Sequence, residues 1–131
     1  MALETLLPFG WPRPKGYANG IAAEGRIVFV AGQIGWDETG AFPDASFTGQ
    51  FRQTLLNTLA VLKAGGAGPE HVARMTWFIT DKAAYLESLR DIGAIWRDLF
   101  GAHYPAMAVV VVSALIEDKA LVEIETTAVV S

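Results

Sequence analysis

Apolar and polar residues alternate most regularly near the end of the chain, over residues 121–129. Alternation with a period of two is typical of a β-strand with one buried face. One side of this predicted strand is apolar, whereas the other carries two carboxylates, Glu123 and Glu125. The preceding apolar segment, residues 107–112, ends in four consecutive valines and does not alternate. Such a run is typical of a strand that is buried on both faces, and a polar turn through residues 117–119 joins the two predicted strands.

Helical periodicity marks two longer segments. The first begins at Asp44 or Ser46, either of which can cap a helix, and it ends at a pair of glycines. Its apolar stripe consists of Phe51, Leu55, Leu59 and Leu62. The second begins at Thr80 or Asp81 and ends at Gly101. Its apolar stripe consists of Tyr85, Leu89, Ile92, Trp96 and Leu99.

The remaining segments complete the predicted element order. Residues 1–15 contain three prolines and no periodicity, which predicts an extended arm rather than a helix or strand. Two apolar segments, residues 17–21 and 26–31, predict a hairpin, and residues 72–80 alternate as a further strand. The order is β-β-α-β-α-β-β in a single domain spanning residues 1–131. Helices separated by single strands favour an α+β fold, with a mixed sheet and both helices on one face.

The composition bears on assembly and partners. Apolar residues make up 52% of the 131 residues, and the mean hydropathy is +0.32. A small monomer covers itself with polar residues, so this surplus predicts buried subunit interfaces. The net charge of −4 and the pI near 5.0 argue against a nucleic-acid-binding surface. The absence of cysteine excludes disulfides and Cys-based zinc sites.

No targeting, membrane or metal-binding pattern is found in the sequence. The first residues lack the basic region of a signal peptide. The longest apolar run, residues 104–116, contains Pro105 and Ser113 and is shorter than the roughly 18–20 residues of a membrane helix. We therefore expect a soluble, cytoplasmic protein that does not bind membranes. His71 and His103 have no partner at metal-ligand spacing, and the glycines form no nucleotide-binding motif, so we expect no metal and no cofactor.

Several short motifs follow one another in a characteristic order. They are Tyr17 with Gly20, the run FVAGQIG at residues 29–35 followed by Thr39-Gly40, Gln53 with Asn57 before Gly65-Gly66, and Tyr104-Pro105-Ala106 before a valine-rich strand and Val122-Glu123-Ile124-Glu125. Together they resemble the Rid family (YjgF/YER057c/UK114), whose best-known members hydrolyse reactive enamines and imines. The resemblance implies a chorismate-mutase-like fold and a homotrimer whose three sheets wall a central barrel. It also implies that small molecules bind in clefts between subunits.

One position departs from the family pattern. The imine hydrolases place an arginine directly after the Pro-Ala pair, where it clamps the substrate carboxylate, and this chain has Met107 there. A thioether cannot replace the two parallel hydrogen bonds of a guanidinium group. Arg13, Lys15 and Arg52 are candidates to take over this role, although ordinary solvated charge is the commoner role for each of them.

The resemblance also assigns roles to other residues. Glu123 matches the glutamate that positions the water attacking the imine carbon, whereas Glu125 is interpreted as structural. From the residues alone, the two carboxylates are about 7 Å apart on one strand face, and pairing with arginines is the commoner explanation. Tyr17 matches a tyrosine that closes over the ligand, although a half-buried strand aromatic fits it equally well. Gly32 and Ala106 match positions that offer backbone groups.

The large side chains and the missing arginine leave two functional hypotheses. Trp11, Trp36 and Met107 predict a larger and more apolar cleft, whereas Trp77 and Trp96 are expected in the core. The first hypothesis is a hydrolytic deaminase of enamines and imines, similar to 2-iminobutanoate/2-iminopropanoate deaminases but with altered specificity. The second is a non-catalytic trimeric module that binds a small metabolite or a protein partner. Ribonuclease activity has been attributed to the family, but the acidic composition does not favour it.

Overall fold

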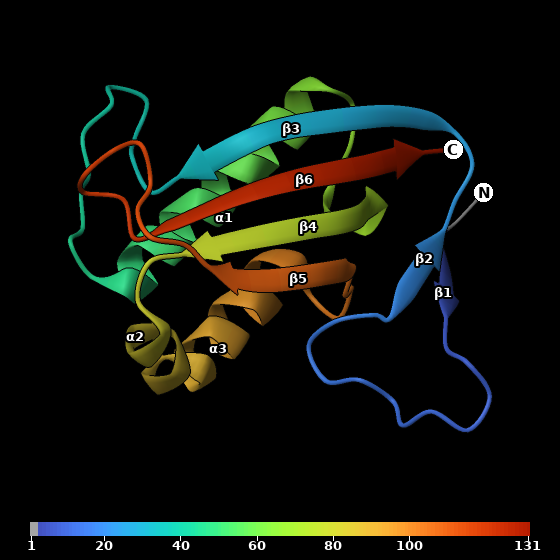
Figure 1. The fold of residues 1–131 in the computed structure, drawn as a ribbon. Helices are drawn as coiled ribbons and strands as arrows, with labels where there is room; N and C mark the ends of the chain where they lie inside the picture. Colours follow the sequence, from blue (N-terminus) through green and yellow to red (C-terminus); the bar gives the residue numbers. More distant parts are fainter. Residues whose placement is uncertain (1–2) are drawn as a thin grey trace.

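The computed structural model describes residues 3–131, which form two β-sheets and three α-helices (Figure 1). The elements in chain order are β1 (Glu4–Leu6), β2 (Gly20–Ala22), β3 (Arg26–Ile34), α1 (Phe47–Ala64), the 3₁₀-helix η1 (Pro69–His71), β4 (Val72–Ile79), α2 (Lys82–Glu87), α3 (Leu89–Phe100), β5 (Ala106–Val111) and β6 (Val122–Val130). The main sheet has the strand order β3-β6-β4-β5. Only β5 runs parallel to its neighbour, β4, among these described strands. The mixed sheet confirms the predicted fold class.

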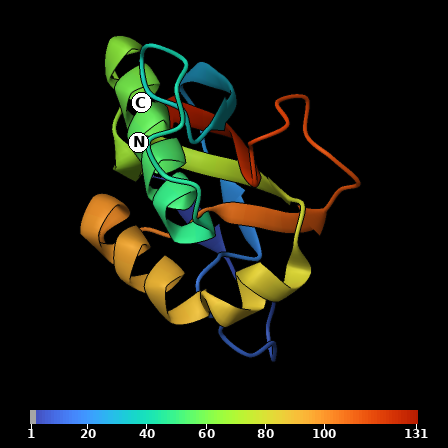
Figure 2. The ribbon, with the colours of Figure 1, turned by 90° about the vertical axis from the view of Figure 1, so that its left-hand side faces the viewer.

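Both long helices cover the same face of the main sheet, as predicted (Figure 2). Phe51 and Leu55 of α1 are fully buried against this face. The predicted alternation of the two central strands, β4 and β6, is confirmed, because one side of each strand forms the core. The buried residues of these strands are Val72, Met75, Trp77, Ile79, Val122, Ile124, Thr126 and Ala128.

The helix ends follow the predicted capping residues, but the second helix is divided. The Ser46 hydroxyl accepts the Gly49 N–H at 3.1 Å, and the Asp81 carboxylate accepts the Ala84 N–H at 3.1 Å. A single helix after Asp81 was expected, whereas α2 and α3 are separated at Ser88. The Ser88 hydroxyl donates to the carbonyl oxygen of Ala84 at 2.7 Å. Such a bond to the backbone one turn earlier often bends a helix.

The predicted hairpin between the first two apolar segments is wrong. Strand β2 pairs with β1 in a separate two-stranded sheet, so the predicted arm includes a strand. The Ala18 N–H donates to the carbonyl oxygen of Pro105 at 2.9 Å, and Ala18 forms a parallel bridge to Ala106. The chain before β2 is thereby held at the β5 edge, whereas β3 forms the opposite edge. Residues 1 and 2 of the predicted arm lie outside the described residues.

The second face of the main sheet has no helix over it in the described chain (Figure 2). Large apolar residues on this outer face are exposed, including Ile27 and Val110. Phe29 is 76% exposed. The strand predicted to be buried on both faces, β5, is therefore uncovered on one side within a single chain. An apolar face of this kind favours association with further copies of the chain.

We expect a homotrimer in solution. Sedimentation equilibrium at micromolar concentration is expected to return three times the chain mass of 14.1 kDa. Phe29→Glu is expected to shift this mass towards that of the monomer, because a buried unpaired carboxylate costs several kcal/mol. Phe9→Glu is the matched control, since Phe9 is 93% exposed on the arm. A monodisperse wild-type monomer would overturn both the trimer and any site between subunits.

Candidate functional site

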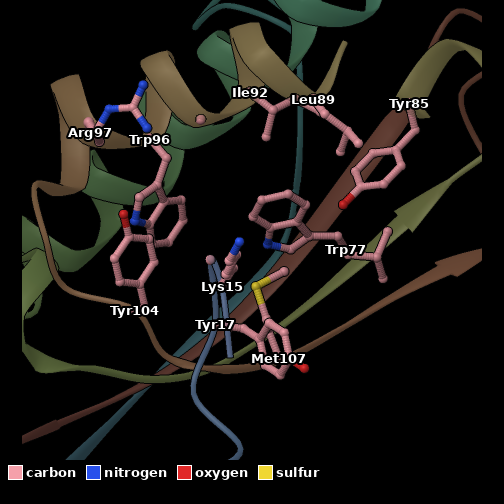
Figure 3. A pocket seen from close by; sticks show the side chains of 13 residues that line it. Lys15, Tyr17, Trp77, Tyr85, Leu89, Ile92, Trp96, Arg97, Tyr104 and Met107 are labelled. Atoms are coloured by element: carbon pink, nitrogen blue, oxygen red, sulfur yellow. The ribbon is translucent and has the colours of Figure 1, made fainter. Parts of the chain in front are cut away.

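A cavity of about 720 Å³ lies between the helix pair α2–α3 and strands β4 and β5, and residues 15–17 of the arm form part of its wall (Figure 3). This volume is within the usual range for small-molecule sites. Its aromatic lining consists of Tyr17, Trp77, Tyr85, Trp96 and Tyr104. Its aliphatic and thioether lining consists of Leu89, Ile92, Met107 and Val109. The cavity is thus mostly apolar, with a few polar groups at defined places.

Two of the predicted site residues meet in this cavity. Met107 pairs in register with Met75 of β4, which is buried in the core, and its side chain therefore lies on the helix-covered face. The hydrogen bond between Ala18 and Pro105 holds the arm against the start of β5. Tyr17 consequently lies beside Met107 although the two are far apart in the sequence (Figure 3).

Two tryptophans belong both to the core and to the cavity wall. Trp77 and Trp96 are each 4% exposed, which confirms the expectation that they are core residues. The Trp96 indole N–H donates to the carbonyl oxygen of His103 at 3.0 Å. The Trp77 indole N–H has no partner anywhere in residues 3–131. Sequence reasoning missed their contribution to the site, because buried aromatic residues at strand and helix spacing are typical of any core.

The polar groups of the cavity favour a negatively charged ligand. Within the part of the chain that the structure describes, its lining includes Lys15 and Arg97 and no acidic residue. Neither cation takes part in an ion pair within residues 3–131. Burial raises the pKa of the Tyr85 hydroxyl, so this group remains a hydrogen-bond donor at neutral pH. Arg97 had no sequence signal that distinguishes it from an ordinary helix-surface arginine.

The other two candidate replacements for the missing arginine lie elsewhere. Arg52 donates to the carboxylate of Asp98, and this ion pair joins α1 to α3 outside the cavity. Arg13 lines a neighbouring depression together with Lys15 and Tyr17. Of the three cations considered from the sequence, only Lys15 reaches the main cavity.

Glu123 lies on the outer face of the sheet, away from the cavity. It is opposite Ile34 of β3 and Phe78 of β4, and its neighbours Val122 and Ile124 point into the core. A Cβ atom at Gly32 would overlap its carboxylate, so the glycine leaves the space that this carboxylate occupies. Gly32 also falls in the register shift of β3, where the regular pairing with β6 is interrupted.

The remaining predicted residues are dispersed. Trp36 lines a third depression, beside Gln33 and Asn57, and its carbonyl oxygen accepts from the Asn57 amide at 2.7 Å. Ala106 adjoins the cavity, and its bridge to Ala18 fixes the local backbone. Glu125 is exposed on the outer face. One chain therefore brings Tyr17 and Met107 together but holds Glu123, Gly32 and Trp36 apart from them.

The histidines have structural surroundings. A ring nitrogen of His103 is 2.7 Å from the carbonyl oxygen of Val72, and the Nδ1 of His71 accepts the Gly68 N–H at 2.9 Å. Across residues 3–131, no three His, Asp or Glu side chains form a group that could hold a metal ion. None of the helices described in this range is long and apolar enough to cross a membrane.

Comparison with known proteins identifies the family. The family model described as "Endoribonuclease L-PSP" matches residues 12–130, which is nearly the whole chain. A solved structure from Yersinia pestis, YyfB of the conserved Rid protein family, superposes with a TM-score of 0.85 at 28% identity and covers 99% of this chain and 100% of its own. The chain belongs to the Rid family.

Two curated relatives cover most of this Rid protein. "RutC family protein PH0854" of Pyrococcus horikoshii is 34% identical over 127 residues, covering 95% of this chain and 96% of its own. "Putative reactive intermediate deaminase TdcF" of Escherichia coli K12 is 35% identical over 117 residues, covering 86% of this chain and 85% of its own. The expected family membership is thus confirmed. The family relationship supports a RidA-like role at the level of the family.

Proposed function

We propose that this Rid protein is a hydrolytic deaminase of enamines or imines, and that its site lies in a cleft between two copies of the chain. The observation that carries the proposal is the division of the candidate residues between two faces of one sheet. Tyr17 and Met107 line the cavity on the helix-covered face, whereas Glu123 is on the outer face. The outer face of a second copy, placed against the β5 edge, supplies the carboxylate that this cavity lacks.

The similarity to TdcF supports the class of reaction. In the hydrolysis of an imine, a water oxygen bonds to the imine carbon while the C=N π electrons move to nitrogen. A proton passes from the water to that nitrogen, which gives a carbinolamine. Transfer of the remaining hydroxyl proton to the amino nitrogen, with cleavage of the C–N bond, then releases ammonia and leaves a carbonyl group. The Glu123 carboxylate orients this water and accepts its proton. Tyr17 covers the ligand, and backbone groups at Gly32 and Ala106 bind it.

Gly32 is expected to matter because of the space it leaves. Gly32→Ala places a methyl group where the Glu123 carboxylate lies, and that carboxylate must move. Displacement of a catalytic group by about 1 Å costs up to a hundredfold in rate, so we expect kcat to fall by tenfold or more. The melting temperature is expected to change little, since the residue is exposed. An unchanged kcat would show that this carboxylate has no part in the reaction.

The proposed function is tested by turnover of imines that an amino-acid oxidase generates in solution. The remaining imine is trapped with semicarbazide at fixed times, with and without the Rid protein. Faster loss of imine in the presence of the wild-type protein is the expected result. Substrates with apolar side chains of increasing size are compared, because the cavity of about 720 Å³ is large for a four-carbon imino acid.

A second candidate function is a trimeric binding module without catalysis. Met107 favours it, since the thioether replaces the group that binds the substrate carboxylate in the imine hydrolases. In that case the cavity binds a metabolite that is not converted. Calorimetric binding of an oxo acid without turnover of the corresponding imine is the result expected of this second function.

A further inference from the structure

The cavity contains a buried hydrogen-bond donor that nothing in the chain uses. The Trp77 side chain is 4% exposed, and its indole N–H has no partner within residues 3–131. A buried donor without a partner costs stability, and most such groups in folded proteins are paired. Figure 3 shows the Trp77 indole nitrogen and the Lys15 amino group directed towards the middle of the cavity, in the region of Met107. Both residues line this one cavity.

The charge of the cavity specifies the acceptor that fits it. Lys15 and Arg97 both line it, and among its lining residues from the described chain there is no carboxylate. An ammonium group together with an indole N–H provides charge-assisted and neutral donors for two oxygen atoms of one anion. A carboxylate therefore fits the position that Lys15 and Trp77 face.

The remaining walls suit a planar apolar group. The planes of the Trp96 and Tyr104 rings are inclined by 15° to each other, and their centroids are 6.2 Å apart. The ring centroids of Trp77 and Trp96 are 6.0 Å apart. Flat surfaces of this kind favour stacking or edge-to-face contact with an aromatic ring. A cavity of about 150 Å³ is enough to hold benzene, so about 720 Å³ leaves room for a ring as well as a carboxylate.

We infer that this cavity selects carboxylates that carry an aromatic ring. The Lys15 ammonium group and the Trp77 indole N–H bind the carboxylate, and the ring lies against Trp96 and Tyr104. Lys15 and Trp77 thus take over part of the role that the arginine has in the imine hydrolases. The corresponding substrates for imine hydrolysis are 2-imino acids with aromatic side chains. This assignment of substrates rests on the proposed function.

Equilibrium binding to the intact protein tests the inference without any turnover. Phenylpyruvate, 2-oxobutanoate and the uncharged phenylacetone are titrated by calorimetry. Phenylpyruvate is expected to bind at least tenfold more tightly than 2-oxobutanoate, because burial of a phenyl group contributes one to two orders of magnitude to a binding constant. Lys15→Gln is expected to weaken phenylpyruvate binding about tenfold or more, and Trp77→Phe about three- to tenfold. Both losses are expected to be larger than any change in the affinity for phenylacetone, which has no carboxylate.

Lys63→Gln is the matched control, since Lys63 lies in the last turn of α1 outside the cavity. Circular dichroism verifies that each variant is folded. Equal affinities for the two oxo acids, or unchanged phenylpyruvate affinity in a folded Lys15→Gln protein, would overturn the inference. Selective phenylpyruvate binding without imine turnover upholds the inference and removes the proposed hydrolase. Turnover of small imines without preference for aromatic ones would overturn the inference and uphold the proposed hydrolase.

Discussion

Glu123→Gln is expected to reduce kcat for imine hydrolysis by about a hundredfold or more. A carboxylate that accepts a proton in the transition state typically contributes a factor of 10²–10⁴, and a neutral amide cannot accept that proton. The substitution keeps the size of the side chain. Glu123 takes part in neither ion pair of the described single chain, so stability is expected to remain close to wild type. Steady-state kinetics on oxidase-generated imines and thermal unfolding measure the two effects.

Glu125→Gln is the matched control for this prediction. Glu125 lies two residues further along β6, on the same outer face, and is exposed. The Glu125→Gln substitution is expected to leave kcat within about twofold of wild type. Full activity of the Glu123→Gln protein would exclude the proposed role of Glu123. A change of ligand affinity alone, with no turnover in either protein, would favour the binding module.

Met107→Arg is expected to raise kcat/KM for small 2-imino acids by about a hundredfold. These substrates lack a ring, and their carboxylate is the main group available for binding. A desolvated, charge-assisted contact to a carboxylate is worth several kcal/mol, which corresponds to about two decades in kcat/KM. The side chain at position 107 points into the cavity, so an arginine there reaches the ligand (Figure 3). Wild-type protein is expected to hydrolyse such small imines only slowly.

Two further variants isolate the cause of this gain. Met107→Gln has a similar length and no charge, and it is expected to give no increase. Met107→Arg combined with Lys15→Gln is expected to keep a gain over wild type on small imines, but a smaller one than the single variant, because one of the two cations that bind the carboxylate is lost. Absence of any gain in a correctly folded Met107→Arg trimer would contradict the prediction and favour the binding module. Rapid wild-type turnover of small imines would show that Lys15 already replaces the arginine fully.

Much of the local structure could be predicted because its causes are local. The alternation that places Trp77 and Ile124 on buried faces depends only on the two-residue period of a strand. The caps at Ser46 and Asp81 depend on a side chain that reaches the backbone three residues later. The division between α2 and α3 at Ser88 was missed, because apolar residues continue at helical spacing across it. The hydrogen bond from the Ser88 hydroxyl to the Ala84 carbonyl oxygen does not change this spacing.

The candidate site was predictable only in part. Tyr17, Met107 and Glu123 were found through the order of motifs that resembles the Rid family, and two of these three line or adjoin the same cavity. Trp77 and Arg97 were not identified. An aromatic residue on the buried side of a strand has the same pattern whether or not its N–H finds a partner. A helix arginine likewise has the same pattern whether it faces solvent or a cavity.

The sequence by itself determined the type of each main element, the sides that face the core and the membership of the Rid family. Tertiary structure alone decided that β2 pairs with β1, that the Ala18 backbone is tied to β5, and that Glu123 and Met107 lie on opposite faces of one sheet. The physical reason is that periodicity and capping act between residues a few positions apart. Strand pairing and cavities depend on hydrogen bonds and packing between distant segments, and many pairings satisfy the same local pattern.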